Sequence, residues 1–174
     1  MSRQIINIDE LDYRPWGHGH GRPGETTPGE DYDARLGDIA RRLGAQKLGY
    51  NLTVLPPGKR AFPFHHHRVN EEMFFILEGE GEIRLGAGRY PIRTGDVIAC
   101  PAGGPETAHQ IINTSTTGEL KYLAVSTRHS PEIAEYPDSG KFAIVAELPS
   151  DADKPQFFRF VGRSGESLDY WEGE

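Results

Sequence analysis

Residues 58–79 contain side chains of the types that bind metal ions. His65 and His67 lie two residues apart, and Glu72 follows five residues after His67. On an extended strand, residues two apart point to the same face, so both imidazoles can reach one point. If the chain reverses between Val69 and Glu71, Glu72 can face them from the next strand. Two neutral imidazoles and a carboxylate form a ligand set that suits a divalent transition metal.

His109 is the candidate fourth ligand, because it lies on a predicted strand that could pair across the barrel from the histidine strand. Glu71 remains an alternative to Glu72, although Glu72 shares a strand face with apolar residues and Glu71 fits a solvated turn. His66 points to the opposite strand face and is excluded from the ligand set. Three histidines and a glutamate predict one divalent ion per chain, and Mn, Fe, Ni, Co or Zn would each be chemically suitable.

The elements that must position these residues are predicted to be short strands. From residue 47 to residue 126, apolar and polar residues alternate with a period of two, and glycine and proline separate the runs. The runs are residues 48–54, 72–77, 82–85, 89–92, 97–100, 108–113 and 120–126. No helical pattern interrupts them. This spacing predicts an all-β fold, either a sandwich or a barrel.

The segments on either side of these strands are less regular. Residues 1–34 are rich in glycine and are predicted to be a loop-like arm, in which His18 and His20 repeat the two-apart spacing without an acidic partner. Residues 33–43 fit one short helix that would stop at Gly44.

The end of the chain completes the expected domain organisation. Residues 130–140 are predicted to be a loop, and two short strands follow at 141–147 and 157–161. We therefore expect one domain in three parts. They are an N-terminal arm (1–45) packed on the barrel, the barrel with its metal site (46–127), and a C-terminal extension (128–174).

Composition narrows the possible partners and the compartment. The chain has 174 residues and a net charge of −7, with no basic cluster, so neither nucleic acid nor an anionic membrane surface is an expected partner. No apolar run approaches the ~20 residues that span a membrane, and residues 1–12 lack the apolar core of a signal peptide. Cys100 is the single cysteine, which excludes an intrachain disulfide and is interpreted as a core residue. These features predict a cytoplasmic protein.

Two ordered motifs resemble those of the cupin family. In the first motif, four residues separate His67 from Glu72, and six separate Glu72 from Gly79, as in the family pattern; Gly58 lies one residue further from His65 than in that pattern. The resemblance covers roughly residues 48–126.

The second motif follows the first at the expected separation. Its matching positions are Gly95, Pro101, Gly103, His109 and Asn113. Five residues separate Gly103 from His109, where the family has two, which lengthens the loop beside the metal. The resemblance implies a double-stranded β-helix, or jelly-roll barrel, whose metal ligands are His65, His67, Glu72 and His109.

Two classes of function remain open. The first is an enzyme, either an isomerase of a small polar carbonyl or sugar-phosphate-like compound, as some similar small cupins are labelled, or a metal-dependent dioxygenase. The second is a non-catalytic cupin that binds a small molecule. Glu106, in the lengthened loop, is the candidate general base, and its alternative interpretation is a solvated loop residue.

Assembly is predicted from the apolar residues that project away from the metal face of the strands. These are Phe62, Phe64, Met73, Phe75 and Leu77. Because a barrel alone would expose them, we expect the arm and the C-terminal extension to cover them together with a second subunit, in a homodimer.

Overall fold

A six-stranded antiparallel sheet forms one wall of the protein in the computed structural model, which describes residues 4–20, 26–149 and 156–174. In spatial order its strands are β1 (Tyr13–Gly17), β2 (Asp33–Asp38), β3 (Leu48–Leu55), β10 (Leu120–Thr127), β5 (Glu72–Glu78) and β8 (Val97–Cys100). Phe74 and Ile76 of β5 are buried, as are Leu120 and Tyr122 of β10. Since residues two apart share a strand face, one face of this sheet lies in the core.

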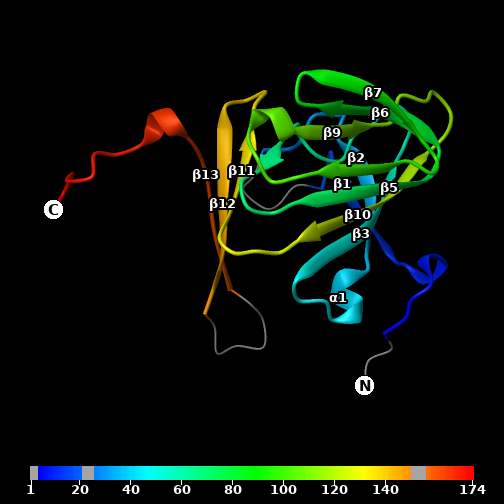
Figure 1. Cartoon of the computed structure of the whole chain (residues 1–174), viewed down its shortest axis with the longest axis horizontal. Coiled ribbons are helices and arrows are strands. Elements are labelled where there is room, and N and C mark those ends of the chain that lie inside the picture. The colour runs from blue at the N-terminus through cyan, green and yellow to red at the C-terminus, as the bar shows by residue number, and fades with distance from the viewer. Residues whose placement is uncertain (1–3, 21–25, 150–155) are drawn as a thin grey trace.

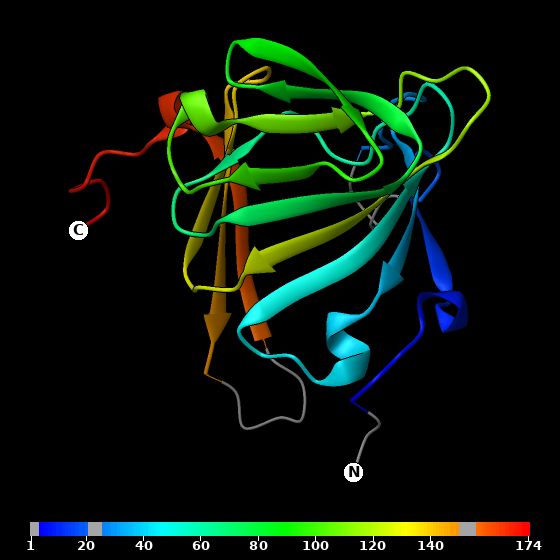
Figure 2. The same ribbon diagram turned by 45° about the vertical axis from the view of Figure 1, so that its right-hand side comes forward.

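A three-stranded sheet forms the opposite wall, above the larger sheet in Figure 2. Its strands, in spatial order, are β7 (Gly88–Arg93), β6 (Glu80–Leu85) and β9 (His109–Ile112). Ile83, Ile92 and Ile111 of this sheet belong to the same buried cluster as Ile76. Burial of each such side chain is worth about 1.5–3 kcal/mol, so this shared core holds the two walls together. The predicted all-β class is confirmed.

A four-stranded sheet crosses one end of this barrel (Figure 1). In spatial order its strands are β13 (Gln156–Arg163), β12 (Lys141–Leu148), β11 (Glu132–Tyr136) and β4 (His66–His67). The register places His67, Ala134, Ala143 and Val161 in one row across the four strands. Paired residues of antiparallel strands lie on the same face. The C-terminal extension therefore shares a sheet face with a predicted metal ligand.

The helix predicted over residues 33–43 is wrong in its first half. Asp33–Asp38 is strand β2, and only Ala40–Leu43 forms the short helix α1. Strand β2 pairs with both β1 and β3, and this tertiary pairing overrides a pattern that fitted either structure. The predicted stop at Gly44 is confirmed, since its φ of 74° is left-handed. Within the described ranges, no helix is long and apolar enough to cross a membrane.

Two segments predicted as loops contain strands. Residues 130–140 include β11, which pairs with β4 and β12. The N-terminal arm contains a 3₁₀ helix, Ile8–Glu10, and strand β1 at the edge of the large sheet. Pro15 lies within β1, and an edge strand tolerates proline because one of its sides needs no ladder hydrogen bonds.

Two of the apolar residues that were predicted to face outward, Phe64 and Leu77, are covered by other parts of the same chain. Phe64 is buried beneath Arg84, whose guanidinium carbon lies 3.9 Å from the ring centre. Leu77 packs against a second small core that includes Leu11 of the arm. Strand β13 is the strand with several exposed aromatic residues, among them Phe158 and Phe160, which are 48% and 46% exposed.

Candidate metal centre

The four predicted ligands meet where the three sheets come together. His67 lies on β4, Glu72 begins β5, and His109 begins β9. His65 precedes β4 and forms a β-bridge with His109, through backbone N–H···O distances of 3.2 and 2.8 Å. This bridge fixes the two histidines side by side, a tertiary contact that no local spacing could predict.

The histidine rings surround the carboxylate of Glu72. Its Oε2 lies 2.9 Å from Nε2 of His109, 3.5 Å from Nε2 of His67 and 3.9 Å from Nε2 of His65. One ligand atom from each of the four residues lies within 4.8 Å of every other. Ligand atoms held about 2.1 Å from a common ion lie about 3–4 Å from each other. The cluster therefore needs only small adjustments to hold a cation.

The second nitrogen of each ring is directed away from the cluster. Nδ1 of His65 lies 2.8 Å from the carbonyl oxygen of Pro63, and Nδ1 of His109 lies 3.3 Å from that of Thr107. A carbonyl oxygen can only accept a hydrogen bond, so in the neutral ring of His65 Nδ1 donates a proton and Nε2 carries the lone pair. This is the tautomer that a metal ligand requires. Both nitrogens of His109 face acceptor oxygens, because its Nε2 lies 2.9 Å from the Glu72 carboxylate, and an ion bound at Nε2 would replace that hydrogen bond.

His67 shows most directly that the site suits a cation. Both of its ring nitrogens are buried, and neither has a hydrogen-bond partner among the described residues. Its Nδ1 lies 3.8 Å from the carboxylate of Glu132. Because a buried nitrogen without a partner costs stability, these atoms are better explained by an ion at Nε2 and by Glu132 orienting Nδ1.

The electrostatics of the cluster favour a charged carboxylate beside a neutral His65. Burial would lower the pKa of His67, but the carboxylates of Glu72 and Glu132 raise it. Burial would raise the pKa of Glu72, but the hydrogen bond from His109 and the nearby imidazole of His67 hold it well below the usual range. Burial, with the neighbouring His109, lowers the pKa of His65 to about 4. At neutral pH the cluster thus presents an anion and a neutral imidazole, the protonation states that bind metal.

The structure separates these four residues from His66, Glu71 and His18, the other residues considered from the sequence. His66 is buried on the opposite face, with its Nδ1 3.1 Å from the carbonyl oxygen of Gly103 and its Nε2 3.4 Å from Glu135. Glu71 is exposed and lies outside the cluster, which includes Glu72. His18 is bonded to the carbonyl oxygen of Pro28 in the arm.

Glu106 lies outside the cluster as well. Its carboxylate accepts a hydrogen bond from the backbone N–H of Gly104, and backbone hydrogen bonds lower its pKa. A carboxylate held in this way is a weaker base.

Burial raises the pKa of Cys100 to about 12, in agreement with a core position. Asn113 bonds the carbonyl oxygens of Leu55 and Gly118 and therefore orders a turn.

Sequence reasoning missed two residues beside the cluster, Glu132 and Tyr136, because their segment was predicted to be a loop. Tyr136 stacks on His65, with ring centres 6.2 Å apart. A sequence signal for these residues does exist. Alternate residues from Glu132 to Tyr136 fit a short strand, on which Glu132, Ala134 and Tyr136 share one face. The face assigned to Phe62 was also wrong, since its ring centre lies 6.5 Å from that of His65.

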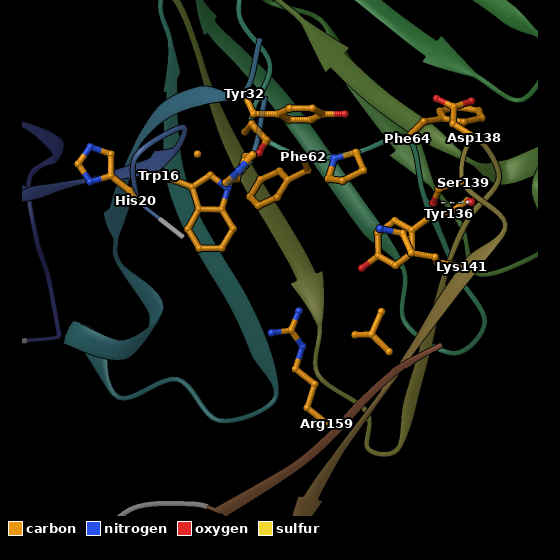
Figure 3. A pocket seen from close by; sticks show the side chains of 15 residues that line it. Trp16, His20, Tyr32, Phe62, Phe64, Tyr136, Asp138, Ser139, Lys141 and Arg159 are labelled. Carbon is orange, nitrogen blue, oxygen red and sulfur yellow. Dashed lines mark hydrogen bonds between the residues drawn. The ribbon is translucent and has the colours of Figure 1, made fainter. Parts of the chain in front are cut away.

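A cavity of about 490 Å³ borders the cluster (Figure 3). Its aromatic lining residues are Trp16, Tyr32, Phe62, Phe64 and Tyr136, and its charged lining residues include Asp138, Lys141 and Arg159. The four predicted ligands do not line it. Its connection to them is through Phe62 and Tyr136, whose rings contact His65.

Comparison with known proteins supports this description. Residues 51–126 match the family described as Cupin domain. One similar solved structure is a sugar phosphate isomerase of a cupin superfamily from Silicibacter pomeroyi. It superposes with a TM-score of 0.71, covers 97% of this chain and 98% of the isomerase chain, and is 25% identical in sequence. Together with the paired sheets, this likeness confirms the predicted double-stranded β-helix.

Two curated relatives are named for different functions. Quercetin 2,3-dioxygenase from Bacillus subtilis is 26% identical over 68% of this chain and 40% of its own length. Oxalate-binding protein from Thermotoga maritima is 38% identical over 41% of this chain and 54% of its own length. The chain thus spans about half the length of the curated relatives that it matches.

Proposed function

We propose that this chain, which carries a cupin domain, is a metal-dependent isomerase of small hydroxy-carbonyl compounds of the sugar-phosphate type. The observation that carries the proposal is the convergence of three Nε2 atoms and the Glu72 carboxylate beside a cavity large enough for such a compound. The likeness to a sugar phosphate isomerase along almost the whole chain supports the choice of substrate class.

His65, His67, Glu72 and His109 would hold one divalent transition metal, of which Mn, Fe, Ni, Co and Zn all accept this ligand set. When bound, such an ion polarises a carbonyl group and stabilises negative charge that develops on neighbouring oxygens.

The protein's own residues prepare the site for this chemistry. Pro63 and Thr107 accept hydrogen bonds from the Nδ1 atoms of His65 and His109, which keeps these two rings in one orientation. Tyr136 is the polar cavity residue whose ring contacts a ligand histidine. Because burial raises the pKa of Tyr136, its hydroxyl stays protonated at neutral pH and can donate a hydrogen bond to a substrate oxygen.

The test is exchange of solvent deuterium into a panel of sugar phosphates, with dioxygen uptake measured in parallel. An aldose–ketose shift moves a proton between neighbouring carbons, so the metal-loaded protein should catalyse exchange at one of them. His67→Ala should abolish exchange, whereas Glu106→Gln, which alters a carboxylate outside the cluster, should leave it unchanged.

The other outcomes point to the other function classes. Metal-dependent uptake of dioxygen without exchange would replace the isomerase by a dioxygenase, the activity of the Bacillus subtilis relative. Tight metabolite binding with neither reaction would leave a binding protein, as the name of the Thermotoga maritima relative describes.

A further inference from the structure

Asn70 is a buried residue in the turn between β4 and β5, and its side-chain amide is fully bonded. The residue is only 6% exposed. Its Oδ1 accepts hydrogen bonds from the hydroxyl of Thr127, at 2.9 Å, and from the backbone N–H of His129, at 2.6 Å. Its Nδ2 donates to the carbonyl oxygen of His129, at 3.0 Å, and to the carboxylate of Glu132. These contacts use both lone pairs and both protons of the amide.

The partners of this amide fix its orientation. A backbone N–H can only donate and a carbonyl oxygen can only accept, so the two backbone groups of His129 admit the amide in one orientation. In that orientation Nδ2 is directed at Glu132, whose carboxylate also accepts a hydrogen bond from the backbone N–H of Asn70, at 2.7 Å. Asn70 therefore holds Glu132 through both its main chain and its side chain.

Asn70 lies where two passages of the chain between sheets meet. Its own turn leads from β4 of the four-stranded sheet to β5 of the six-stranded sheet, and residues 128–131 lead from β10 of the six-stranded sheet to β11 of the four-stranded sheet. Thr127 at the end of β10 also binds the turn directly, because its hydroxyl accepts a hydrogen bond from the backbone N–H of Glu71, at 3.1 Å. The amide thus ties the two passages to each other.

Glu132 connects this amide to the candidate metal centre. The oxygen of Glu132 that Asn70 binds is Oε2, the same oxygen that lies 3.8 Å from Nδ1 of His67. The loss of the bond from Nδ2 would leave this carboxylate freer to turn away from the imidazole. Asn70 itself is outside the cluster of candidate ligands, so any influence on a bound ion must pass through other residues.

We propose that Asn70 is a positioning residue of the metal centre, which acts by holding the Glu132 carboxylate against His67. This inference rests on the metal site of the proposed function, and not on its isomerase reaction. A group that orients a metal-bound imidazole typically contributes 10–100-fold to metal affinity. A residue that acts through such a group should affect affinity only while that group is present.

The test is titration of the full chain with cobalt against a competing chelator. Asn70→Ala should weaken cobalt binding about tenfold. In the Glu132→Gln background the same substitution should weaken it less than about twofold further, because no carboxylate is left to position. Unchanged affinity in Asn70→Ala would overturn the inference, and so would a tenfold loss that persists in the Glu132→Gln background.

Asn113→Ala is the matched control. Asn113 is also a buried asparagine, whose Nδ2 donates to two backbone carbonyl oxygens, but it is outside the cluster. Its loss should lower the melting temperature of the metal-free protein and leave cobalt affinity unchanged. A loss of affinity equal to that of Asn70→Ala would show a general effect of destabilisation and would overturn the inference.

Thr127→Val decides the question if Asn70→Ala does not fold. It removes the hydroxyl that binds the amide of Asn70 and nearly preserves the side-chain shape. It should weaken cobalt binding about threefold where Glu132 is present, and unchanged affinity there would overturn the inference.

The deuterium-exchange assay separates this role from the reaction. The expected cobalt affinities without exchange would keep the role of Asn70 and remove the isomerase. Exchange with unchanged cobalt affinity in Asn70→Ala would keep the isomerase and remove the role of Asn70.

Discussion

Glutamine in place of Glu132 should weaken metal binding without removing a ligand. Glu132 lies 3.8 Å from Nδ1 of His67, and the two side chains are only 12% and 18% exposed. Its carboxylate also accepts hydrogen bonds from the backbone N–H groups of Asn70, at 2.7 Å, and Ile133, at 2.8 Å. The carboxylate is thus held in place, and its charge acts on the imidazole of His67 across a contact that is largely shielded from water.

The size of the effect follows from this distance. Two unit charges 3.8 Å apart interact by about 4 kcal/mol at an effective dielectric constant of about 20. A bound ion transfers only part of its charge to the far side of the imidazole. We therefore expect the 10–100-fold loss of affinity typical of such outer partners, about 1.4–2.7 kcal/mol.

Cobalt titration against a competing chelator measures this loss, and Glu135→Gln is the matched control. Glu135 is on the same strand but faces the non-ligand His66, with 3.4 Å between Oε2 and Nε2. Melting temperatures of the metal-free variants show whether the fold is retained. Unchanged affinity in Glu132→Gln, or an equal loss in Glu135→Gln, would refute the role given to Glu132.

Four other perturbations test the rest of the structure. His67→Ala and His109→Ala should each reduce the metal content from about one ion per chain to near zero by elemental analysis, and full occupancy in both would show that the cluster is not the site. The metal-free protein should lose stability as the pH falls from about 6.5 towards 4. Burial lowers the pKa of His65 to about 4, so in this pH range the unfolded chain binds more protons than the folded protein. A melting temperature that stays constant over this range would contradict the prediction. Ile76→Ala should lower the free energy of unfolding by about 2–5 kcal/mol in urea, since Ile76 is fully buried, and a change under about 0.5 kcal/mol would argue against this core. Light scattering should give the mass of a homodimer that Phe158→Asp converts to a monomer, and a monomeric mass for the unmodified chain would remove the subunit contact.

The strands and the paired histidines could be predicted because their signals are local. Alternation alone placed β5 and β8 within a residue of their observed bounds. The spacing of His65 and His67 needs only strand geometry to bring their rings together. Glu72 and His109 could be named as candidates from their strand positions, but their approach to the two histidines depends on how the sheets pack, and only the family motifs implied it.

The remaining features could not be predicted because distant contacts decide them. Asp33–Asp38 fits a helix or a strand, and only pairing with β1 and β3 selects the strand. The cavity collects side chains from Trp16 to Val161, so no single stretch of sequence describes it. Glu132 became a candidate only when β11 was found to pair with β4.

The origin of the ligands has a mechanical consequence. His67, Glu72 and His109 belong to three different sheets, which otherwise meet through loops, isolated bridges and side-chain packing. One ion bound to all of them would act as a cross-link between the sheets. Loading should therefore slow amide hydrogen exchange in β4, β5 and β9 together, and its removal should let the C-terminal sheet open while the barrel stays closed.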